Sequence, residues 1–493
     1  MLQHHNTYSA KAWLKLSLFL LAFFTIWQLG IQPATAATHT VCKTGGCEFS
    51  SIQAAINGSI SGDVLTFPIN KETYEERITL NKSLTFVGQT TAINAQAGGT
   101  AVTINGSPTV IMQNMIIQNG SGTNGGGILL NGGDLTITNS SLNNNNVSSN
   151  GGALYITSAS STVQLTDVTM QLNTAVTSGG AIYNNGTLNA DDLTLTDNSA
   201  TDGGGIYNNG TVFVENQSAI QRNVASNSGG GVYNAAGRSF SFNTSDMSNN
   251  EAQLGAGIFN QGTLQATNVN LGSGNVAAQN GGGLHNSGTA TLTNSAVVQN
   301  QADTGAGVYN EGGLTANNST FSRNTGLDNQ HSANGPGLYN QSGTAVLNNV
   351  TLHLTFGTSV FANGGTVEMK NSIISSALGT SGLTVCGGSG NFVSQGYNLS
   401  SDQSCTFLTQ TGDLQGVDPN LNGITSPAEG AAYHTPKLTS PVVDAGNPAT
   451  PGSGGNACLA SDQRGLARPQ SQRCDIGAVE IVVYRLYMPS VTK

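Results

Sequence analysis

A short glycine-rich signature recurs nine times between Gly125 and Asn340, and its period limits what the chain can fold into. Each copy has a glycine-rich pair or triplet followed by an aliphatic residue. Most copies then have an aromatic residue and an asparagine, as in the copy that ends at Asn208. Equivalent positions, counted from Leu129 to Tyr339, are 24 to 30 residues apart. No helical pattern separates the copies. Such a period predicts a solenoid that adds one coil per repeat.

The residues between the copies indicate the kind of solenoid. They form short runs of alternating apolar and polar residues, broken by Gly, Asn and Asp. This pattern is typical of three short strands joined by tight turns. The sequence therefore predicts an all-β fold of stacked parallel coils, roughly 12 in number.

Asparagine recurs at three phases of the repeat. Asparagine tolerates the left-handed backbone of a tight corner, and identical amides stacked coil on coil can hydrogen-bond into a ladder. Three phases therefore predict three corners with three ladders. The first set is Asn184, Asn208, Asn234, Asn260, Asn286, Asn310 and Asn340; the second is Asn139, Asn216, Asn243, Asn268, Asn294, Asn318 and Asn349; the third is Asn145, Asn173, Asn198, Asn223, Asn250, Asn275, Asn300 and Asn324.

The signature strand can be oriented because side chains alternate between the two faces of a strand. If the aliphatic residue points into the core, the aromatic residue after it points out. The small residue before the aliphatic one would share the outer face and leave room for the ring. The opposite register, with the rings inside, is the alternative. The predicted outer stripe, our candidate ligand surface, is Tyr155, Tyr183, Tyr207, Tyr233, Phe259, His285, Tyr309 and Tyr339.

The first 36 residues differ from the rest of the chain. Lys11 and Lys15 precede an apolar run, and the small residues of segment 34–36 follow it, which is the layout of a secretory signal peptide. The alternative is a membrane anchor, but Thr25 and Gln28 interrupt a run that is shorter than the roughly 20 residues a span needs. We therefore expect a secreted or cell-surface protein with no transmembrane segment in the mature chain.

Helix and proline signals suggest how the mature chain is divided. Residues 37–120 are expected to hold an N-terminal cap and the first coils, with a short helix that has Ser50 as its N-cap and ends at Gly58. Central strands exclude proline, and eight of the 12 prolines follow Gly416. We assign 121–375 to the repeat coils, 376–480 to a C-terminal cap region and 481–493 to a tail, either a sorting or anchoring segment or a final edge strand.

The six cysteines all lie in the part expected to be exported. They form three close pairs, which suggests three local disulfides, although six cysteines allow 15 pairings. A metal site is not expected, because the sequence has no Cys-x-x-Cys pair and no nearby histidine set. We predict neither a metal nor a cofactor. The expected pairs are Cys42–Cys47, Cys386–Cys405 and Cys458–Cys474.

Charge restricts the possible partners. The formal charge is −10, and it becomes −12 when Lys11 and Lys15 are removed with the leader. An acidic chain without a basic stripe is a poor nucleic-acid binder. We expect a monomer whose partner is a polysaccharide or a cell-surface glycan.

Three segments resemble known families. The first coils carry Ser-Ile-Gln-Ala-Ala-Ile at 51–56, Gly-Asp at 62–63 and Thr-Tyr-Glu-Glu at 73–76, and they resemble the right-handed parallel β-helices of the pectin-lyase-like superfamily. The Gly-Gly-Ala-Ile-Tyr-Asn copies resemble repeats of chlamydial polymorphic outer membrane proteins. The segments from Gly396 to Glu480 resemble the tail of choice-of-anchor Q surface proteins. Together the resemblances cover nearly all of the mature chain and imply an exported bacterial surface protein with an irregular, disulfide-stapled C-terminal cap.

The sequence also departs from those families. Only about a dozen residues follow Glu480, so we do not expect the long barrel domain by which autotransporters cross an outer membrane. The motifs of pectate lyases and polygalacturonases are not found.

Charged residues give no clear catalytic site. Asp191 and Asp192 are the only adjacent acidic pair in the repeats, and such a pair is usually solvated or part of a corner. A denser charged set in the tail is expected to fix the cap through ion pairs. We predict no catalytic residue and favour a non-catalytic adhesive or polysaccharide-binding rod. The alternative is a carbohydrate-active enzyme, a polysaccharide lyase or a glycoside hydrolase, on the same fold. The charged set of the tail is Asp462, Arg464, Arg468, Asp475 and Glu480.

Overall fold

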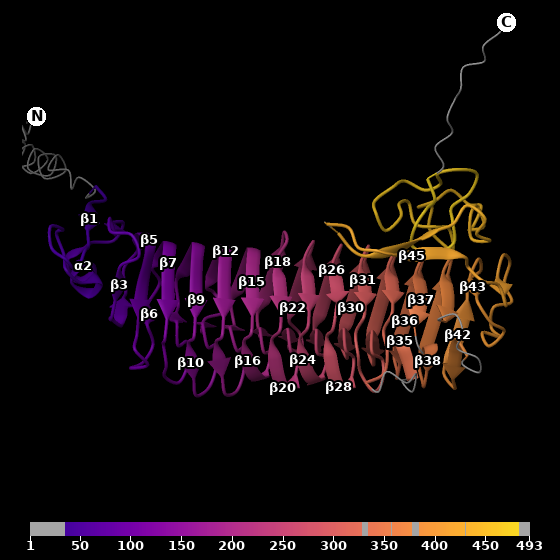
Figure 1. Cartoon of the computed structure of the whole chain (residues 1–493), viewed down its shortest axis with the longest axis horizontal. Helices are drawn as coiled ribbons and strands as arrows, with labels where there is room; N and C mark the ends of the chain where they lie inside the picture. The colour runs from indigo at the N-terminus through magenta and orange to yellow at the C-terminus, as the bar shows by residue number, and fades with distance from the viewer. Residues whose placement is uncertain (1–34, 328–333, 356, 377–383, 429, 483–493) are drawn as a thin grey trace, which may run out of the picture.

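The protein is an elongated rod of coils stacked along one axis (Figure 1). This computed structural model describes residues 35–327, 334–355, 357–376, 384–428 and 430–482. The predicted signal peptide lies outside the described residues except for positions 35 and 36, and most of the predicted tail also lies outside them. The coils number about 14, against the roughly 12 expected, and the predicted all-β parallel solenoid is confirmed. The coils that lack the signature lie before and after the nine coils that carry it.

Two long sheets and one short sheet form the rod, and all their strand pairings are parallel. The short sheet occupies only the middle coils. The signature sheet has 13 strands: β4 (Ile78–Leu80), β6 (Val102–Asn105), β8 (Ile128–Asn131), β11 (Leu154–Ile156), β14 (Ile182–Asn184), β17 (Ile206–Asn208), β21 (Val232–Asn234), β25 (Ile258–Asn260), β29 (Leu284–Asn286), β32 (Val308–Asn310), β35 (Asn334–Asn340), β38 (Thr358–Ala362) and β41 (Cys386–Gly388). The short sheet has six: β10 (Asn146–Val147), β13 (Thr174–Ala175), β16 (Ser199–Asp202), β20 (Val224–Ser228), β24 (Glu251–Leu254) and β28 (Val276–Asn280).

The large sheet has 25 strands and bends once in each coil. Early coils run through the bend as one long strand, whereas later coils divide it into a first and a second strand. Its members are β1 (Thr38–Thr40), β2 (Val64–Thr66), β3 (Thr73–Tyr74), β5 (Leu84–Asn94), β7 (Thr109–Gln118), β9 (Asp134–Asn143), β12 (Thr162–Gln171), β15 (Thr187–Thr196), β18 (Thr211–Glu215), β19 (Ala219–Gln221), β22 (Ser239–Asn243), β23 (Asp246–Ser248), β26 (Thr263–Thr267), β27 (Asn270–Gly272), β30 (Thr289–Thr293), β31 (Ala296–Val298), β33 (Gly313–Asn317), β34 (Thr320–Ser322), β36 (Thr344–Asn348), β37 (Thr351–Thr355), β39 (Thr366–Lys370), β40 (Ile373–Ser376), β42 (Asn391–Ser394), β43 (Leu399–Ser400) and β44 (Leu414–Gln415).

The signature letters each have a structural role. The first glycine forms a corner, with φ of 64° at Gly203, and a Cβ there would lie 2.4 Å from the carbonyl oxygen of Ile206. Glycine fits this corner because it has no Cβ to meet that oxygen and adopts a positive φ without strain. The aliphatic residue is fully buried in the core and the aromatic residue lies on the outer face, so the expected register is confirmed.

The small residue before the aliphatic one faces inward, which corrects our expectation that it shares the outer face with the ring. A Cβ on Gly205 would lie 3.4 Å from Ile220 and 3.5 Å from Asn223, and one on Gly283 would lie 3.0 Å from the amide nitrogen of Asn300. The small residue therefore leaves room for a corner asparagine inside the rod.

Two of the three predicted asparagine ladders form. In the first set each Nδ2 donates to Oδ1 of the next coil at 2.7–3.0 Å, and in the third set at 2.9–3.1 Å. These asparagines are fully buried. In the third corner the left-handed residue is mostly the one before the asparagine, as at Leu172 and Arg222.

The second asparagine set forms no ladder. Its position is the bend between the two strands of the large sheet, and the residue there is left-handed with φ of 44–56°. Because that conformation turns the side chain away from the core, the amides do not stack. We call these residues the corner row: Asn114, Asn139, Asp167, Asp192, Asn216, Thr244, Asn268, Asn294, Asn318, Asn349 and Asn371. Thr244, rather than the expected Asn243, occupies the row in its coil.

A short helix closes the N-terminal end of the core. Helix α2 (Ile52–Gly58) buries Ile52, Ala55 and Ile56. Its N-cap is Ser51, one residue later than predicted, because the Ser51 hydroxyl accepts a hydrogen bond from the backbone N–H of Ala54 at 3.1 Å. Glu76 of the next coil accepts two further N–H groups of the first turn.

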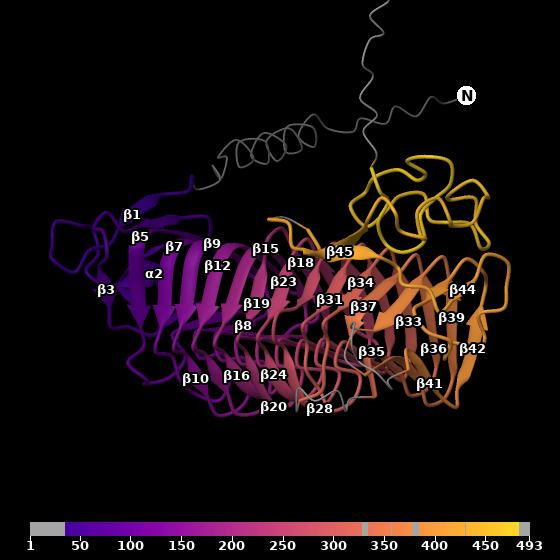
Figure 2. The ribbon, with the colours of Figure 1, turned by 45° about the vertical axis from the view of Figure 1, so that its right-hand side comes forward.

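The C-terminal segment, residues 416–482, folds back along the flank of the rod. It covers the large sheet from about β27 to β43 (Figures 1 and 2). Among its described residues, β45 (Leu421–Thr425) pairs with β46 (Tyr433–Pro436) in antiparallel orientation. The end of the core is covered instead by the preceding loop, where Cys405 and Leu408 join the core. The three disulfides connect the cysteine pairs expected from the sequence.

Candidate functional site

The aromatic residues form one continuous stack on the outer face of the signature sheet. Neighbouring ring centroids from Tyr155 to Tyr339 are 4.7–5.3 Å apart. Phe361 of β38 adds a ninth ring, 5.2 Å from Tyr339. Sequence reasoning missed Phe361 because no glycine triplet precedes it, although the aliphatic Val360 and the spacing of 22 residues from Tyr339 could have identified it.

Stacking limits what the aromatic stripe can offer a ligand. Both faces of each inner ring contact neighbouring rings, so a sugar cannot stack on them; ring edges and hydroxyl groups remain. Tyr155 to Tyr233 are half-buried, whereas Phe259 to Tyr339 are buried. Burial raises the pKa of Tyr183 and Tyr309 to about 12, so the hydroxyls stay protonated near neutral pH. His285 lies inside the stack, and burial lowers its pKa.

An aromatic ring with no aromatic neighbour in register lies on the first-strand face of the large sheet. Phe213 in β18 is 38% exposed and pairs with Asn189 and Ser241 in the adjacent coils. It lines a hollow of about 450 Å³ together with Gln164 and Glu215. Sequence reasoning missed this site, because its lining comes from three coils and no single repeat contains it.

Asp191 and Asp192, the adjacent acidic pair of the sequence, lie in different surroundings. Asp191 lines the Phe213 hollow beside Glu215 of the next coil, whereas Asp192 is the left-handed residue of the corner row. Both aspartates are exposed. The pair therefore does not act as one unit: only Asp191 faces the hollow, where it lies among polar side chains.

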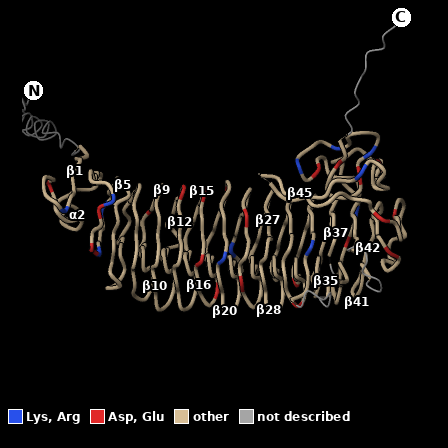
Figure 3. The backbone as a smooth tube through the Cα atoms, in the orientation of Figure 1, with Lys and Arg blue, Asp and Glu red and all other residues tan. Residues whose placement is uncertain are grey.

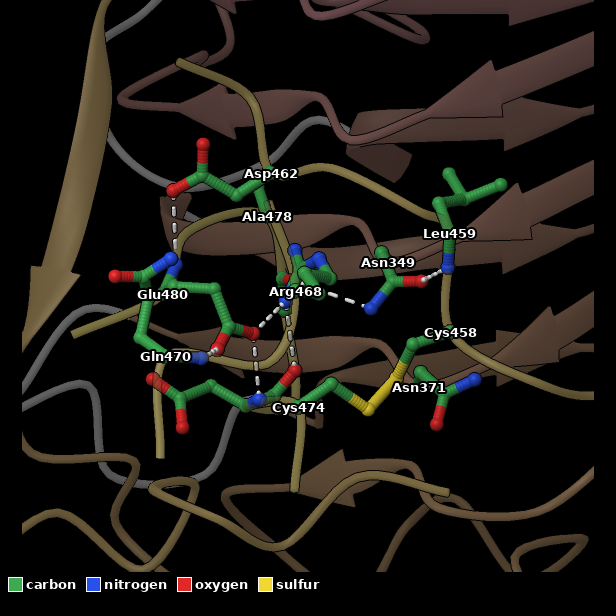
Figure 4. Close-up of polar contacts among 12 residues, drawn as sticks. Asn349, Asn371, Cys458, Leu459, Asp462, Arg468, Gln470, Cys474, Ala478 and Glu480 are labelled. Atoms are coloured by element: carbon green, nitrogen blue, oxygen red, sulfur yellow. Dashed lines mark hydrogen bonds and ion pairs between the residues drawn. A yellow bond between two sulfur atoms is a disulfide. The ribbon is translucent and has the colours of Figure 1, made fainter. Parts of the chain in front are cut away.

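The charged set of the C-terminal segment is a buried structural network (Figure 4). Arg468 is 6% exposed and forms an ion pair with Glu480, and it donates to the carbonyl oxygens of Ser461, Asp475 and Gly477. A second ion pair joins Asp462 and Arg464 at 2.7 Å. The expectation that ion pairs fix this region is confirmed.

Burial changes the titration of this region in two ways. Burial and the charge of Glu480 raise the pKa of Asp475 to about 7. At the hairpin, burial lowers the pKa of His353 to about 3, and it also lowers the pKa of His434. The two imidazoles are in edge contact at 4.7 Å, and His434 is hydrogen-bonded to Ser322 of the rod at 2.9 Å.

Neither a metal cluster nor a membrane-spanning helix is present among the described residues. Within the described part of the chain, no three His, Cys, Asp or Glu residues cluster as metal ligands would. Among those same residues, no helix has the length and hydropathy that crossing a membrane requires.

One family comparison bears on function. The model of the Chlamydia polymorphic membrane protein repeat matches residues 192–209, which run from the corner row through one signature copy. No curated protein matches the chain. The repeat match and the coil architecture together support a β-helix protein of the cell surface or outer membrane.

Proposed function

We propose that the chain is an exported, monomeric and non-catalytic rod that binds polysaccharide at the cell surface. Export would use the N-terminal segment 1–36 as a signal peptide. The observation that carries the proposal is Phe213, an exposed ring without aromatic neighbours in its register, set among polar side chains of three stacked coils.

The chemistry of the Phe213 hollow suits a sugar chain. A sugar ring stacks on a free aromatic face, and its hydroxyls bond to amides and carboxylates beside it. Gln164, Asn189, Asp191 and Glu215 supply those groups. They repeat at the coil spacing of about 4.8 Å, which is close to the length of one sugar unit. The edges and hydroxyls of the aromatic stripe are a second candidate surface.

The test is retention of the secreted protein on a panel of acidic and neutral polysaccharides. Phe213→Ala should reduce retention about five- to tenfold, because the stacking contact is lost. The matched control is Val176→Ala, which removes an exposed apolar side chain, 62% exposed, outside the hollow. A paired Tyr207→Phe and Tyr233→Phe variant removes hydroxyls from the stripe but keeps its stack. Full retention of Phe213→Ala, or no retention of the native protein, would reject the site.

The same assay tests the non-catalytic part of the proposal. We expect no release of new reducing ends or unsaturated products from any polysaccharide in the panel. Product release by the native protein would favour the alternative, a carbohydrate-active enzyme.

A further inference from the structure

The corner row already binds one polypeptide segment, the C-terminal segment of the chain itself. Asn349 accepts the backbone N–H of Leu459 at 3.0 Å and donates to the carbonyl oxygen of Gly477 at 3.4 Å (Figure 4). Asn371 accepts the N–H of Asn447 at 2.9 Å and donates to the carbonyl oxygen of Asn456 at 3.0 Å.

Two further corner residues make related contacts. Asn318 donates to the carbonyl oxygen of Ser461 at 2.8 Å and accepts from the Arg468 guanidinium at 3.4 Å. Asn268 accepts the N–H of Ala431 at 3.3 Å. Between these two lies Asn294, whose Oδ1 is buried without a partner.

The contacts share one mechanism. A side-chain amide presents an N–H donor and a C=O acceptor side by side, as a peptide group does, so an outward amide pairs with a passing backbone. Because one such residue occurs in each coil, the corner row forms a binding surface for a chain that runs along the rod. Every corner residue bound in this way accepts at least one N–H group.

The row continues upstream without an occupant. Asn139, Asp167, Asp192 and Asn216 hold the same corner in successive coils, and all four are exposed. Their side chains make no hydrogen bond or ion pair with any residue that the structure describes. The next outward residues, Ser141, Thr169 and Thr194, are small and polar and do not obstruct the row.

The charge of the free corners differs from that of the occupied ones. Two of the four are aspartates, which accept an N–H more strongly than an amide does but donate nothing. Between residues 83 and 321 the chain has only two Lys or Arg residues, and Figure 3 accordingly shows little blue along the middle coils. Arg222 is paired with Asp197, and Arg238 is bonded to Asn209. The free row therefore favours donors and positive charge.

We propose that the free corner row, Asn139 to Asn216, binds an extended segment of a partner polypeptide that carries basic side chains. Residues 456, 459 and 461 contact the successive corners Asn371, Asn349 and Asn318, so the bound chain advances two or three residues per coil along the row, which indicates an extended path. The two carboxylates indicate lysine or arginine. A second copy of this chain does not fit, because its net charge is −10. The proposal does not rest on polysaccharide binding, which uses the first-strand face.

The test uses the full chain and a synthetic peptide of alternating threonine and lysine, with affinity measured by calorimetry at low salt. The paired variant Asp167→Asn and Asp192→Asn should weaken binding about tenfold, because two charge-assisted hydrogen bonds become neutral. Asparagine occupies the same corner elsewhere, so the fold should be unaffected. The matched control is Glu251→Gln with Asp303→Asn, which removes two exposed charges elsewhere.

A second peptide distinguishes hydrogen bonding to the peptide backbone from attraction between opposite charges alone. The same peptide with N-methylated backbone keeps its charge but loses N–H donors, and we expect it to bind at least about tenfold more weakly. Equal binding of the methylated peptide, or an equal loss in the control variant, would overturn the proposal. So would a cationic glucosamine oligomer that binds the row more tightly than the peptide, because the face would then recognise a polysaccharide.

Discussion

Two regions of the large sheet have the same corner row, but only one of them is covered by another segment of the chain. Downstream of β27 the flank is covered by the C-terminal segment, whereas from β9 to β18 it is open. The second strand beside the corner shows part of the difference. On the open flank the outward column holds Thr169 and Thr194, which the described residues leave uncovered. On the covered flank Ala296, Ile373 and Leu399 of the same column pack against the C-terminal segment, while Thr320 and Thr351 hydrogen-bond to it through Gln463 and Ala478. The corner residues hydrogen-bond to the cover and apolar contacts accompany those bonds on the covered flank, whereas the corner side chains of the open flank have neither among the described residues.

The largest expected effect comes from removing the buried guanidinium of Arg468, which lies between the C-terminal segment and the rod. Arg468→Met leaves Glu480 buried without its partner, which should cost about 3–5 kcal/mol and release the C-terminal segment. Limited proteolysis should then cut within 416–482 while the coils from β9 to β18 resist. The double variant with Glu480→Leu should recover part of the protection. Equal protection of Arg468→Met and the native protein would mean that apolar contact alone holds the cover.

A smaller effect is expected from pH, again on the covered flank only. The folded pKa of Asp475 is raised to about 7, so its contribution is present below the unfolded pKa near 4 and is lost as pH rises through about 7. The folded pKa values of His353 and His434 are lowered, so their contribution is lost as pH falls below about 6.5. Protection of the segment should therefore decline on both sides of an intermediate pH.

The variant Asp475→Asn isolates the alkaline side of this profile. The free energy of unfolding of the variant, minus that of the native protein, should rise by about 2 kcal/mol as the pH goes from about 5 to about 8. Denaturant unfolding of the segment at the two pH values measures this change. A constant difference across that range would show that Asp475 does not titrate there.

The smallest expected difference compares one corner with another. Asn349→Ala and Asn139→Ala place the same residue in the same left-handed conformation, so the backbone strain is matched. Only Asn349 also loses its bonds to Leu459 and Gly477, which should cost about 1–2 kcal/mol more. Thermal or denaturant unfolding measures both. Equal losses would mean that the corner bonds do not stabilise the cover.

The local sequence predicts the structure of a single coil well. It predicts poorly the contacts between distant segments and the sites that several coils form together. The period, the buried aliphatic residues and two asparagine ladders follow from spacing, because each coil repeats the same strands and corners. The second set failed as a ladder because residues such as Asn268 are themselves left-handed and turn outward, which spacing alone does not reveal. The cover over Asn318 comes from residues about 140 positions later, and the Phe213 hollow comes from three coils. Neither follows from a single repeat.

The two asparagine ladders give the rod a direction. Every rung donates toward the following coil, from Asn145 to Asn173 and from Asn184 to Asn208, and never the reverse. A partly folded rod therefore ends in amide N–H groups whose protein acceptors lie in the next coil, so growth from the N-terminal end satisfies each rung as the chain arrives. The same rule lets whole coils be gained or lost during evolution, because the new junction repeats the old one.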